Sequence, residues 1–138
     1  MAASHSPEFV KLCEKARARI TEISATELVA RQGATPLHLV DVREDHEWIK
    51  GHLPGAVHLG KGVIERDIER QIPDPAAEIV LYCGGGYRSA LAACALQDMG
   101  YTRVRSLAGG FRGWQEAGRP IEELPADKPP GPNQGGRS

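Results

Sequence analysis

The stretch that decides the fold is Ile79–Met99, which reads IVLYCGGGYRSALAACALQDM. Its first four residues are apolar and predict a short buried strand, whereas the Ala/Leu-rich run from Ser89 onward predicts a helix. Between them, three consecutive glycines predict a tight loop. This loop begins at Cys83 and ends at Arg88, just before the expected helix. A strand, a loop and a helix in this order form the repeating unit of α/β proteins.

Segments of both kinds alternate on either side of this stretch. Further strands are expected at Leu37–Val42, Val57–Leu59 and Arg103–Leu107, and further helices at Pro7–Arg19, Ser24–Gly33, Glu44–Lys50, Gly60–Arg70 and Gly109–Gln115. The alternation predicts an α/β fold with a central, mostly parallel sheet and helices on both faces. Binding sites of such sheets lie at the carboxyl ends of the strands. Two segments with chemically active residues follow such ends, Asp41-Val-Arg43 and the loop Cys83–Arg88.

Composition argues against several classes of protein. The chain has 138 residues and a formal net charge of −1, which fits one domain and gives no reason to expect nucleic acid or a membrane as a partner. There is no long apolar stretch and no secretory leader pattern. Three cysteines without C-x-x-C spacing argue against a disulfide framework and a cysteine-rich zinc site, so we expect a cytoplasmic protein. Cys94 is expected in the core and Cys13 to be half-buried.

The residues of the glycine loop can activate the sulfur of Cys83. Three glycines allow successive backbone N–H groups to point at one atom, and the start of the following helix adds a positive partial charge there. Arg88 adds a full positive charge. Together these groups are expected to stabilise a nucleophilic thiolate and to hold an anionic product such as a persulfide. A structural cysteine beside a tight turn is the alternative, and it leaves the arginine and the helix start unexplained.

Other glycine-rich or cysteine-containing sites fit less well. A nucleotide-binding P-loop needs Gly-Lys-Ser or Gly-Lys-Thr, which is missing from this loop. A cysteine phosphatase needs the spacing C-x5-R, whereas Cys83 and Arg88 have the spacing C-x4-R, and Ser89 stands where that arginine would be. The shorter loop forms a smaller cradle, which favours a substrate group smaller than phosphate.

The chain resembles the rhodanese-like (sulfurtransferase) domain family, as a single-domain member. Its loop from Cys83 is similar to the six-residue active-site loop of that family. Three further segments are similar to family signatures and occur in the same order: Leu39–Arg43 with Glu47 and Trp48, Gly51–Ala56, and Gly109-Gly110 with Trp114. On this basis we expect an N-terminal helical extension at 1–22 and a rhodanese-like domain at 23–121. The Pro/Gly-rich tail at 122–138 is expected to be disordered.

The resemblance implies a sheet of about five strands and a double-displacement reaction. Cys83 takes a sulfane sulfur from thiosulfate or a persulfide, becomes a persulfide, and passes the sulfur to cyanide, glutathione or another thiol. The residues whose backbone N–H groups are implied to hold the persulfide are Gly84, Gly85, Gly86, Tyr87, Arg88 and Ser89. Arg88 is implied to assist anionic donors, and Asp41 and Arg43 to border or brace the loop. No metal or organic cofactor is implied.

The expected partners are a small sulfur donor, a thiol or cyanide acceptor and, as a further candidate, a thiol protein. The expected assembly is a monomer or a weak homodimer. One departure from the family concerns the donor. Many thiosulfate-using members carry a cationic residue directly after the cysteine, whereas this chain has Gly84, so that Arg88 is the only charge in the loop. The alternatives are a non-catalytic or sulfur-carrier interaction module, and a cysteine phosphatase or arsenate reductase of related fold.

Two residues near the loop also have plainer interpretations. Asp41 can cap the helix that begins near Arg43, or it can brace the loop. Arg43 and Glu47 are four residues apart, so they can pair on one helical face. The leading helix is expected to dock on its own domain rather than on a partner.

Three histidines recur every six residues, at His46, His52 and His58. They fall on a predicted helix, a turn and a strand, so we do not expect their side chains to converge on a metal. His52 is expected to fix its turn by hydrogen bonds.

Overall fold

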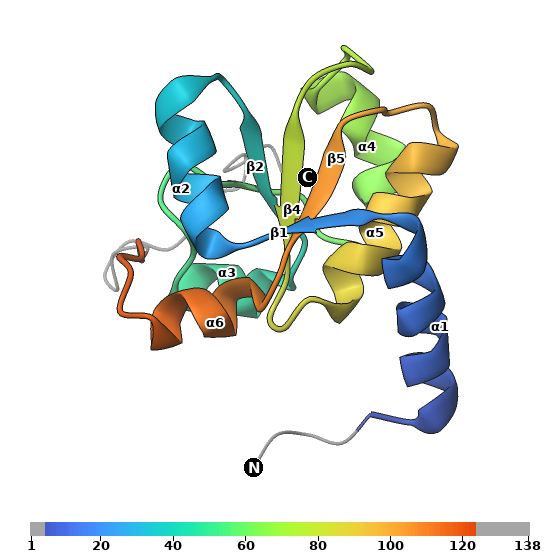
Figure 1. Cartoon of the computed structure of the whole chain (residues 1–138), viewed down its shortest axis with the longest axis horizontal. Helices are drawn as coiled ribbons and strands as arrows, with labels where there is room; N and C mark the ends of the chain where they lie inside the picture. The colour runs from blue at the N-terminus through green and yellow to red at the C-terminus, as the bar shows by residue number, and fades with distance from the viewer. Residues whose placement is uncertain (1–4, 124–138) are drawn as a thin grey trace.

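A parallel sheet organises the molecule. The computed structural model describes residues 5–123, and its sheet has five strands in the order β1-β5-β4-β2-β3, with every neighbouring pair parallel (Figure 1). The strands are β1 (Thr21–Ile23), β2 (His38–Asp41), β3 (Val57–His58), β4 (Ile79–Tyr82) and β5 (Val104–Leu107). The predicted α/β fold with a central parallel sheet of about five strands is confirmed.

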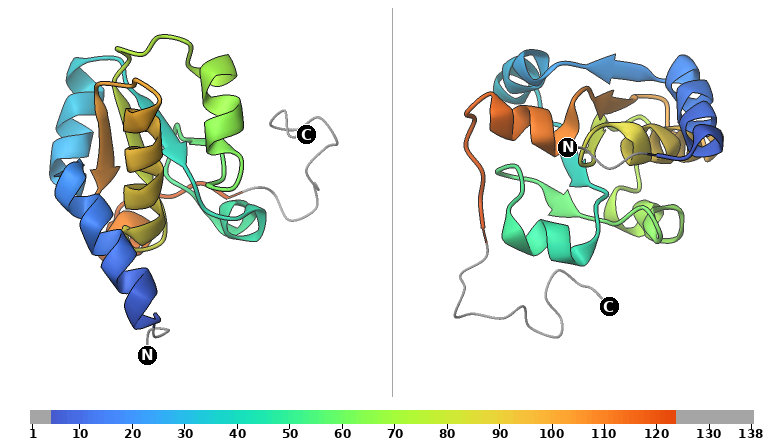
Figure 2. Two further views of the ribbon diagram at one scale, coloured as in Figure 1. Left: turned by 90° about the vertical axis from the view of Figure 1, so that its right-hand side faces the viewer. Right: turned by 90° about the horizontal axis from the view of Figure 1, so that it is seen from below.

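Helices cover both faces of the sheet. Within the described part of the chain they are α1 (Pro7–Arg19), α2 (Ala25–Ala34), α3 (Asp45–Lys50), α4 (Ile64–Gln71), α5 (Tyr87–Asp98) and α6 (Gly110–Glu116). α4 and α5 lie on one face with α1 beside α5, whereas α2 and α6 lie on the other face (Figures 1 and 2). α3, α5 and α6 all begin just beyond the carboxyl ends of strands, where a site is expected in a parallel sheet.

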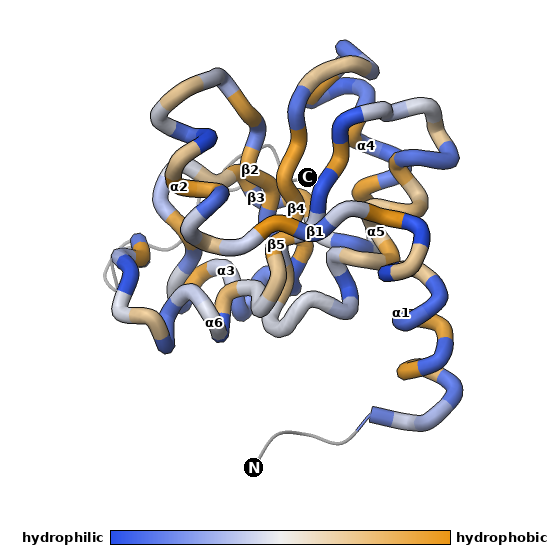
Figure 3. The backbone as a smooth tube through the Cα atoms, in the orientation of Figure 1, coloured by the Kyte–Doolittle hydropathy of each residue, from blue (hydrophilic) through white to orange (hydrophobic). Residues whose placement is uncertain are grey.

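The core has two layers because side chains alternate along each strand. Val40 and Leu81 pack toward α4 and α5, whereas Leu39 and Tyr82 belong to the layer that contains Trp114 of α6. As a result, every residue of β4 is buried, and β2 is buried from Leu39 onward. Figure 3 shows hydrophobic residues in both strands. This pattern is typical of central strands in a parallel sheet that is covered on both faces.

Two elements differ from the sequence pattern. β1 was not predicted, because it is a three-residue edge strand in which only Ile23 is buried, and pairing with β5 defines it. α4 begins at Ile64 rather than at Gly60. The residues just before α4 still pair with the segment after β2, since the N–H of Lys61 donates to the carbonyl of Val42 at 2.9 Å. Both differences come from contacts with a distant strand.

The start of α5 lies two residues earlier than expected. Gly86, with a φ of 112°, is the residue before the first helical turn. Tyr87 and Arg88 therefore belong to the helix rather than to the loop, and Ser89 is its third residue. As a result, the side chain of Arg88 projects from a regular helix, which fixes its direction.

α1 docks on α5, as predicted for the leading helix. Cys13 is fully buried and not half-buried as expected, and Cys94 is buried in the core, where its Sγ donates to the carbonyl of Ala16 at 3.5 Å. At its N-terminal end the helix reaches the first residue of α5, directly after the glycine loop, because the ring centroids of Phe9 and Tyr87 are 5.9 Å apart. α1 is thus a part of the folded unit that borders the site.

The last described residues return to the domain. The N–H of Glu122 donates to the carbonyl of His52 at 2.8 Å, and the N–H of His52 donates to that of Glu122 at 2.9 Å. The predicted tail at 122–138 thus begins with a residue that is paired, and 124–138 lie outside the described residues. Among residues 5–123, no helix combines the length and the apolar character that crossing a bilayer requires.

Candidate active site

Cys83 stands at the carboxyl end of β4, where the glycine loop begins. The residue is buried, with 1% of its surface exposed. Its Sγ accepts a hydrogen bond from the backbone N–H of Gly86 at 3.0 Å and lies 3.4 Å from the Oγ of Ser89. Gly86 has a positive φ of 112°, which an L side chain rarely adopts. The glycine is therefore required for the turn that directs an N–H group at the sulfur.

Ser89 connects this sulfur to a second buried hydroxyl group. Its Oγ lies 2.8 Å from the Oγ of Ser106 in β5, and both serines are fully buried. Because a hydroxyl both donates and accepts, the pair can donate to a thiolate or accept from a thiol at Cys83. Ser106 could not be identified from the sequence, since nothing in its strand pattern marks a residue of the site.

The start of α6 holds the loop from the other side. The N–H of Phe111 donates to the carbonyl of Cys83 at 2.7 Å, and the N–H of Arg112 donates to that of Gly84 at 2.9 Å. Gly110 precedes them with a φ of 57°, and a Cβ atom there would overlap the carbonyl group of Cys83. The Gly109-Gly110 signature thus allows the backbone of α6 to lie directly against the active-site loop.

Arg88 forms an ion pair across the mouth of the site. Its Nη1 donates to Oε1 of Glu47 at 2.8 Å and its Nη2 to Oε2 at 3.1 Å, so the pair is bidentate. The hydrogen bonds from Arg88 lower the pKa of Glu47 to about 2, and Glu47 in turn raises the pKa of Arg88. The predicted pairing of Arg43 with Glu47 is therefore wrong, because the partner of Glu47 lies on α5.

Arg43 pairs with Asp41 instead, inside the protein. The two residues are 4% and 0% exposed, and Arg43 donates from Nη2 to Oδ2 of Asp41 at 2.8 Å and from its backbone N–H to Oδ1 at 2.8 Å. Asp41 does not cap α3, since Glu44 is the N-cap and forms a capping box with Glu47. The guanidinium also lies 4.2 Å from the ring centroid of Phe111. The pair thus links the end of β2 to α6.

Asp41→Ala is expected to lower the free energy of unfolding by about 3–5 kcal/mol, because it leaves the buried Arg43 guanidinium without its counter-charge. Urea unfolding followed by circular dichroism measures this loss. Asp98→Ala is the control, since it breaks only an exposed ion pair with Arg19 and should leave the midpoint nearly unchanged. Equal midpoints for the two variants would contradict a stabilising role of the buried pair.

The histidines have structural contacts. His52 donates from Nδ1 to the carbonyl of Trp48 at 2.9 Å, as expected for a residue that fixes its turn. His58 bonds the carbonyl of Arg43 at 2.7 Å, and both rings stack on the indole of Trp48. Across residues 5–123, no group of three or more His, Cys, Asp or Glu side chains is placed to hold a metal ion.

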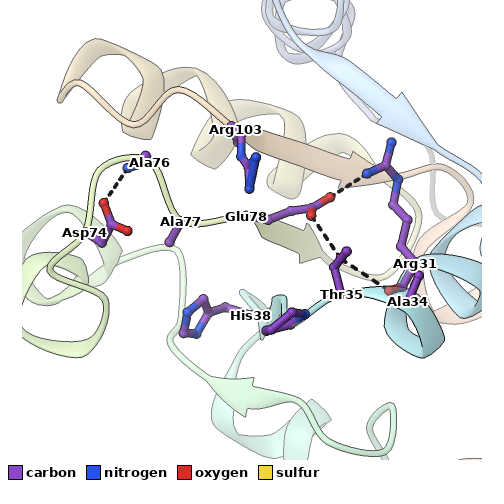
Figure 4. A pocket seen from close by; sticks show the side chains of 10 residues that line it. Arg31, Ala34, Thr35, His38, Asp74, Ala76, Ala77, Glu78 and Arg103 are labelled. Atoms are coloured by element: carbon purple, nitrogen blue, oxygen red, sulfur yellow. Dashed lines mark hydrogen bonds and ion pairs between the residues drawn. The ribbon is translucent and has the colours of Figure 1, made fainter.

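Two pockets lie at opposite ends of the sheet. A pocket of about 290 Å³ adjoins the site and is lined by Glu47, Lys50 and Phe111, among others. A larger pocket of about 720 Å³ surrounds Glu78 before β4, at the end of the sheet opposite Cys83 (Figure 4). Glu78 is paired there with Arg31, at 2.6 Å. The lining of the smaller pocket includes two residues that contact the loop region, since Glu47 binds Arg88 and Phe111 donates to the carbonyl of Cys83.

A cysteine sulfur held by loop donors at the carboxyl end of a parallel strand defines a class of α/β proteins that use a cysteine nucleophile. Comparison with known proteins narrows this class. The model of the rhodanese-like domain family matches residues 24–117, and the chain belongs to that family. The resemblance seen in the sequence is confirmed.

Its relatives include named enzymes. Thiosulfate sulfurtransferase GlpE of Actinobacillus pleuropneumoniae serotype 7 is 36% identical over 105 residues, which cover 74% of this chain and 93% of that protein. A sulfurtransferase of Allochromatium vinosum is 35% identical over 103 residues, covering 74% and 94%. A solved protein of unknown function from Rhodopseudomonas palustris, described as a possible tyrosine phosphatase, has a TM-score of 0.73 at 34% identity and covers 88% and 99%. The predicted class, a rhodanese-type sulfurtransferase, agrees with the two named enzymes and is confirmed.

Proposed function

We propose that this rhodanese-type sulfurtransferase carries the transferred sulfur as a persulfide on Cys83. The supporting observation is the placement of two donors on one sulfur, the N–H of Gly86 at 3.0 Å and the hydroxyl of Ser89 at 3.4 Å, at the start of α5. Both groups can stabilise negative charge, first on the thiolate and then on the terminal sulfur of the persulfide.

The reaction has two displacements. In the first, the Cys83 thiolate attacks the sulfane sulfur of the donor and forms an S–S bond, while the bond between that sulfur and the rest of the donor breaks. The electron pair of the broken bond leaves with the donor remnant, which is sulfite when the donor is thiosulfate. In the second, the acceptor thiolate or cyanide attacks the terminal sulfur, and the Cys83 thiolate leaves. The protein returns to its first state, so the reaction requires no cofactor.

The remaining predicted residues have supporting roles in this proposal. Backbone N–H groups from Gly84 to Ser89 surround the added sulfur atom. The Asp41–Arg43 pair positions α6 through its contact with Phe111, and α6 holds the loop. Asp41 and Arg43 therefore act on the position of the loop rather than on the sulfur itself.

Thiosulfate is the first donor to consider, because it is the substrate in the name of the Actinobacillus relative. The proposed acceptors are cyanide, glutathione and other thiols, including a thiol protein. Three free cysteines, all buried, suit a reducing cytoplasm as the compartment. We further propose a monomer or a weak homodimer.

Incubation of the reduced protein with a sulfane donor is expected to add the mass of one sulfur atom, seen by intact mass spectrometry. Peptide mapping under non-reducing conditions should place it on Cys83, whose Sγ accepts from the N–H of Gly86. By contrast, burial raises the pKa of the Cys13 thiol, and the Sγ of Cys94 donates to the carbonyl of Ala16. Thiosulfate, mercaptopyruvate and a protein persulfide are compared as donors. An unmodified Cys83 with all three donors, or sulfur on another cysteine, would contradict the proposal.

Two alternatives have distinct results. The first alternative is a phosphatase, because the Rhodopseudomonas palustris neighbour is described as a possible tyrosine phosphatase. However, the carboxylate of Glu47, which is bonded to Arg88, would repel a phosphate dianion beside the loop. Turnover of an aryl phosphate that depends on Cys83 would favour this alternative. A sulfur-carrier module would form the persulfide without passing sulfur to cyanide, glutathione or thioredoxin.

A further inference from the structure

The loop's own arginine is poorly placed to attract an anionic donor. Arg88 is bound in a bidentate pair by Glu47, at 2.8 and 3.1 Å. Because the pKa of Glu47 is lowered to about 2, this carboxylate is ionised at any pH near neutrality. The two charges cancel at the distance of a donor molecule, so the pair contributes little net positive charge.

A second guanidinium lies against the loop from α6. A Cβ atom at Gly85 would be 2.9 Å from Nη1 of Arg112, which places this side chain on the third residue of the loop. The Arg112 side chain is exposed, and among residues 5–123 it forms no ion pair with a carboxylate. The backbone of Arg112 is held against the loop, because its N–H donates to the carbonyl of Gly84 at 2.9 Å.

The glycines of the loop make room for these arginines. A Cβ atom at Gly84 would lie 3.1 Å from Nη2 of Arg88, and one at Gly85 would be closer still to Arg112. A larger residue directly after Cys83 would therefore displace a guanidinium. Many thiosulfate-using members carry a cationic residue at the position of Gly84. In this chain, guanidinium groups from other elements lie beside the loop instead.

We infer that Arg112 binds the anionic end of the sulfur donor and is a substrate-binding residue of this site. The inference rests on the proposed persulfide reaction of Cys83. A guanidinium beside the loop can bind two oxygens of a sulfonate group at once. When thiosulfate loses its outer sulfur, the electron pair of the broken bond leaves on sulfite, and Arg112 stabilises that leaving dianion. In this inference Arg112, rather than Arg88, assists anionic donors.

Alkylation of Cys83 tests the charge without any sulfur chemistry. Iodoacetate and iodoacetamide react at the same thiolate with loss of iodide, and they differ by one negative charge. Arg112→Gln is expected to lower the ratio of the iodoacetate rate to the iodoacetamide rate about fivefold, and salt should lower the wild-type ratio toward that of the variant. The iodoacetamide rate itself should stay within about twofold, because the Cys83 hydrogen bonds are unchanged.

Two control variants separate Arg112 from other arginines. Arg88→Gln combined with Glu47→Gln removes both members of the ion pair and leaves the net charge unaltered, so the alkylation ratio should change by less than about twofold. Arg103→Gln removes one exposed charge beside the pocket at the opposite end of the sheet (Figure 4) and should also have little effect. A fall in the ratio for the double variant that equals the fall for Arg112→Gln would overturn the inference.

Steady-state kinetics give a second readout. With thiosulfate, Arg112→Gln is expected to lower kcat/KM about tenfold, mainly through KM, and Arg112→Lys should recover a part of it. An unchanged alkylation ratio together with unchanged kinetics would overturn the role of Arg112. A wild-type protein that alkylates normally but forms no persulfide would instead overturn the proposed function, while the alkylation ratio still decides whether Arg112 draws anions to Cys83.

Discussion

Cys83→Ser is expected to lower the rate of sulfur transfer by at least about a thousandfold. A serine hydroxyl is not ionised near neutral pH, and it cannot form the S–S bond that carries the sulfur. The fold should be kept, because an oxygen at this place can accept from the N–H of Gly86 and bond the hydroxyl of Ser89 as the sulfur does. The loss therefore reports chemistry rather than unfolding.

Sulfite release from thiosulfate and thiocyanate formation from cyanide measure this loss, with thermal unfolding as the check on the fold. Cys94→Ser is the matched control. The Sγ of Cys94 donates to the carbonyl of Ala16, and a hydroxyl can donate to the same carbonyl, so activity should remain within about twofold of wild type. A Cys83→Ser variant that retains more than a few per cent of the activity would exclude a persulfide on this residue.

Gly110→Ala is expected to lower the free energy of unfolding by about 3 kcal/mol or more. Its Cβ would overlap the carbonyl oxygen of Cys83 and lie 2.9 Å from the carbonyl carbon and oxygen of Gly84. These are backbone atoms, so relief requires that α6 move away from the loop. That movement would break the hydrogen bonds that Phe111 and Arg112 donate to it. A φ of 57° adds a further cost for any residue with a Cβ.

The same helix offers the control. At Gly113, a Cβ would meet no atom within 4 Å, and alanine favours a helix by about 0.5–1 kcal/mol relative to glycine. Gly113→Ala should therefore be neutral or stabilising in urea unfolding, whereas Gly110→Ala should lose both stability and sulfur transfer. Similar midpoints for the two variants would show that α6 is not held against the loop as described.

The glycine loop and the place of Cys83 at its start could be predicted from the sequence because their geometry is local. Cys83, three glycines and the start of a helix are consecutive, and the turn made by Gly86 follows from residues within the same stretch. The sheet could be predicted for a related reason, since β4 reads IVLY and β2 has Leu39 and Val40 at its centre. The segments that are similar to rhodanese-family signatures extended the predicted fold to residues 23–121.

The partners of the charged residues could not be predicted in the same way. Spacing favoured a pair between Arg43 and Glu47, but Glu47 binds Arg88 from α5 and Arg43 binds Asp41. An ion pair depends on which side chains approach each other in space, and several choices are equally compatible with one sequence. The sequence therefore suggests that Arg88 binds the anionic sulfur donor, whereas in the structure Glu47 neutralises the charge of Arg88.

Consecutive residues are enough to place Cys83 in a glycine loop before a helix, and to make this loop one residue shorter than that of a phosphatase. What surrounds the sulfur depends on the packing of the other strands and helices. Ser106 reaches Ser89 because β5 lies beside β4, and Arg112 reaches Gly85 because α6 bonds the loop backbone. The physical reason is that local geometry depends on consecutive residues, whereas the environment of a site depends on the packing of elements that are distant in the chain.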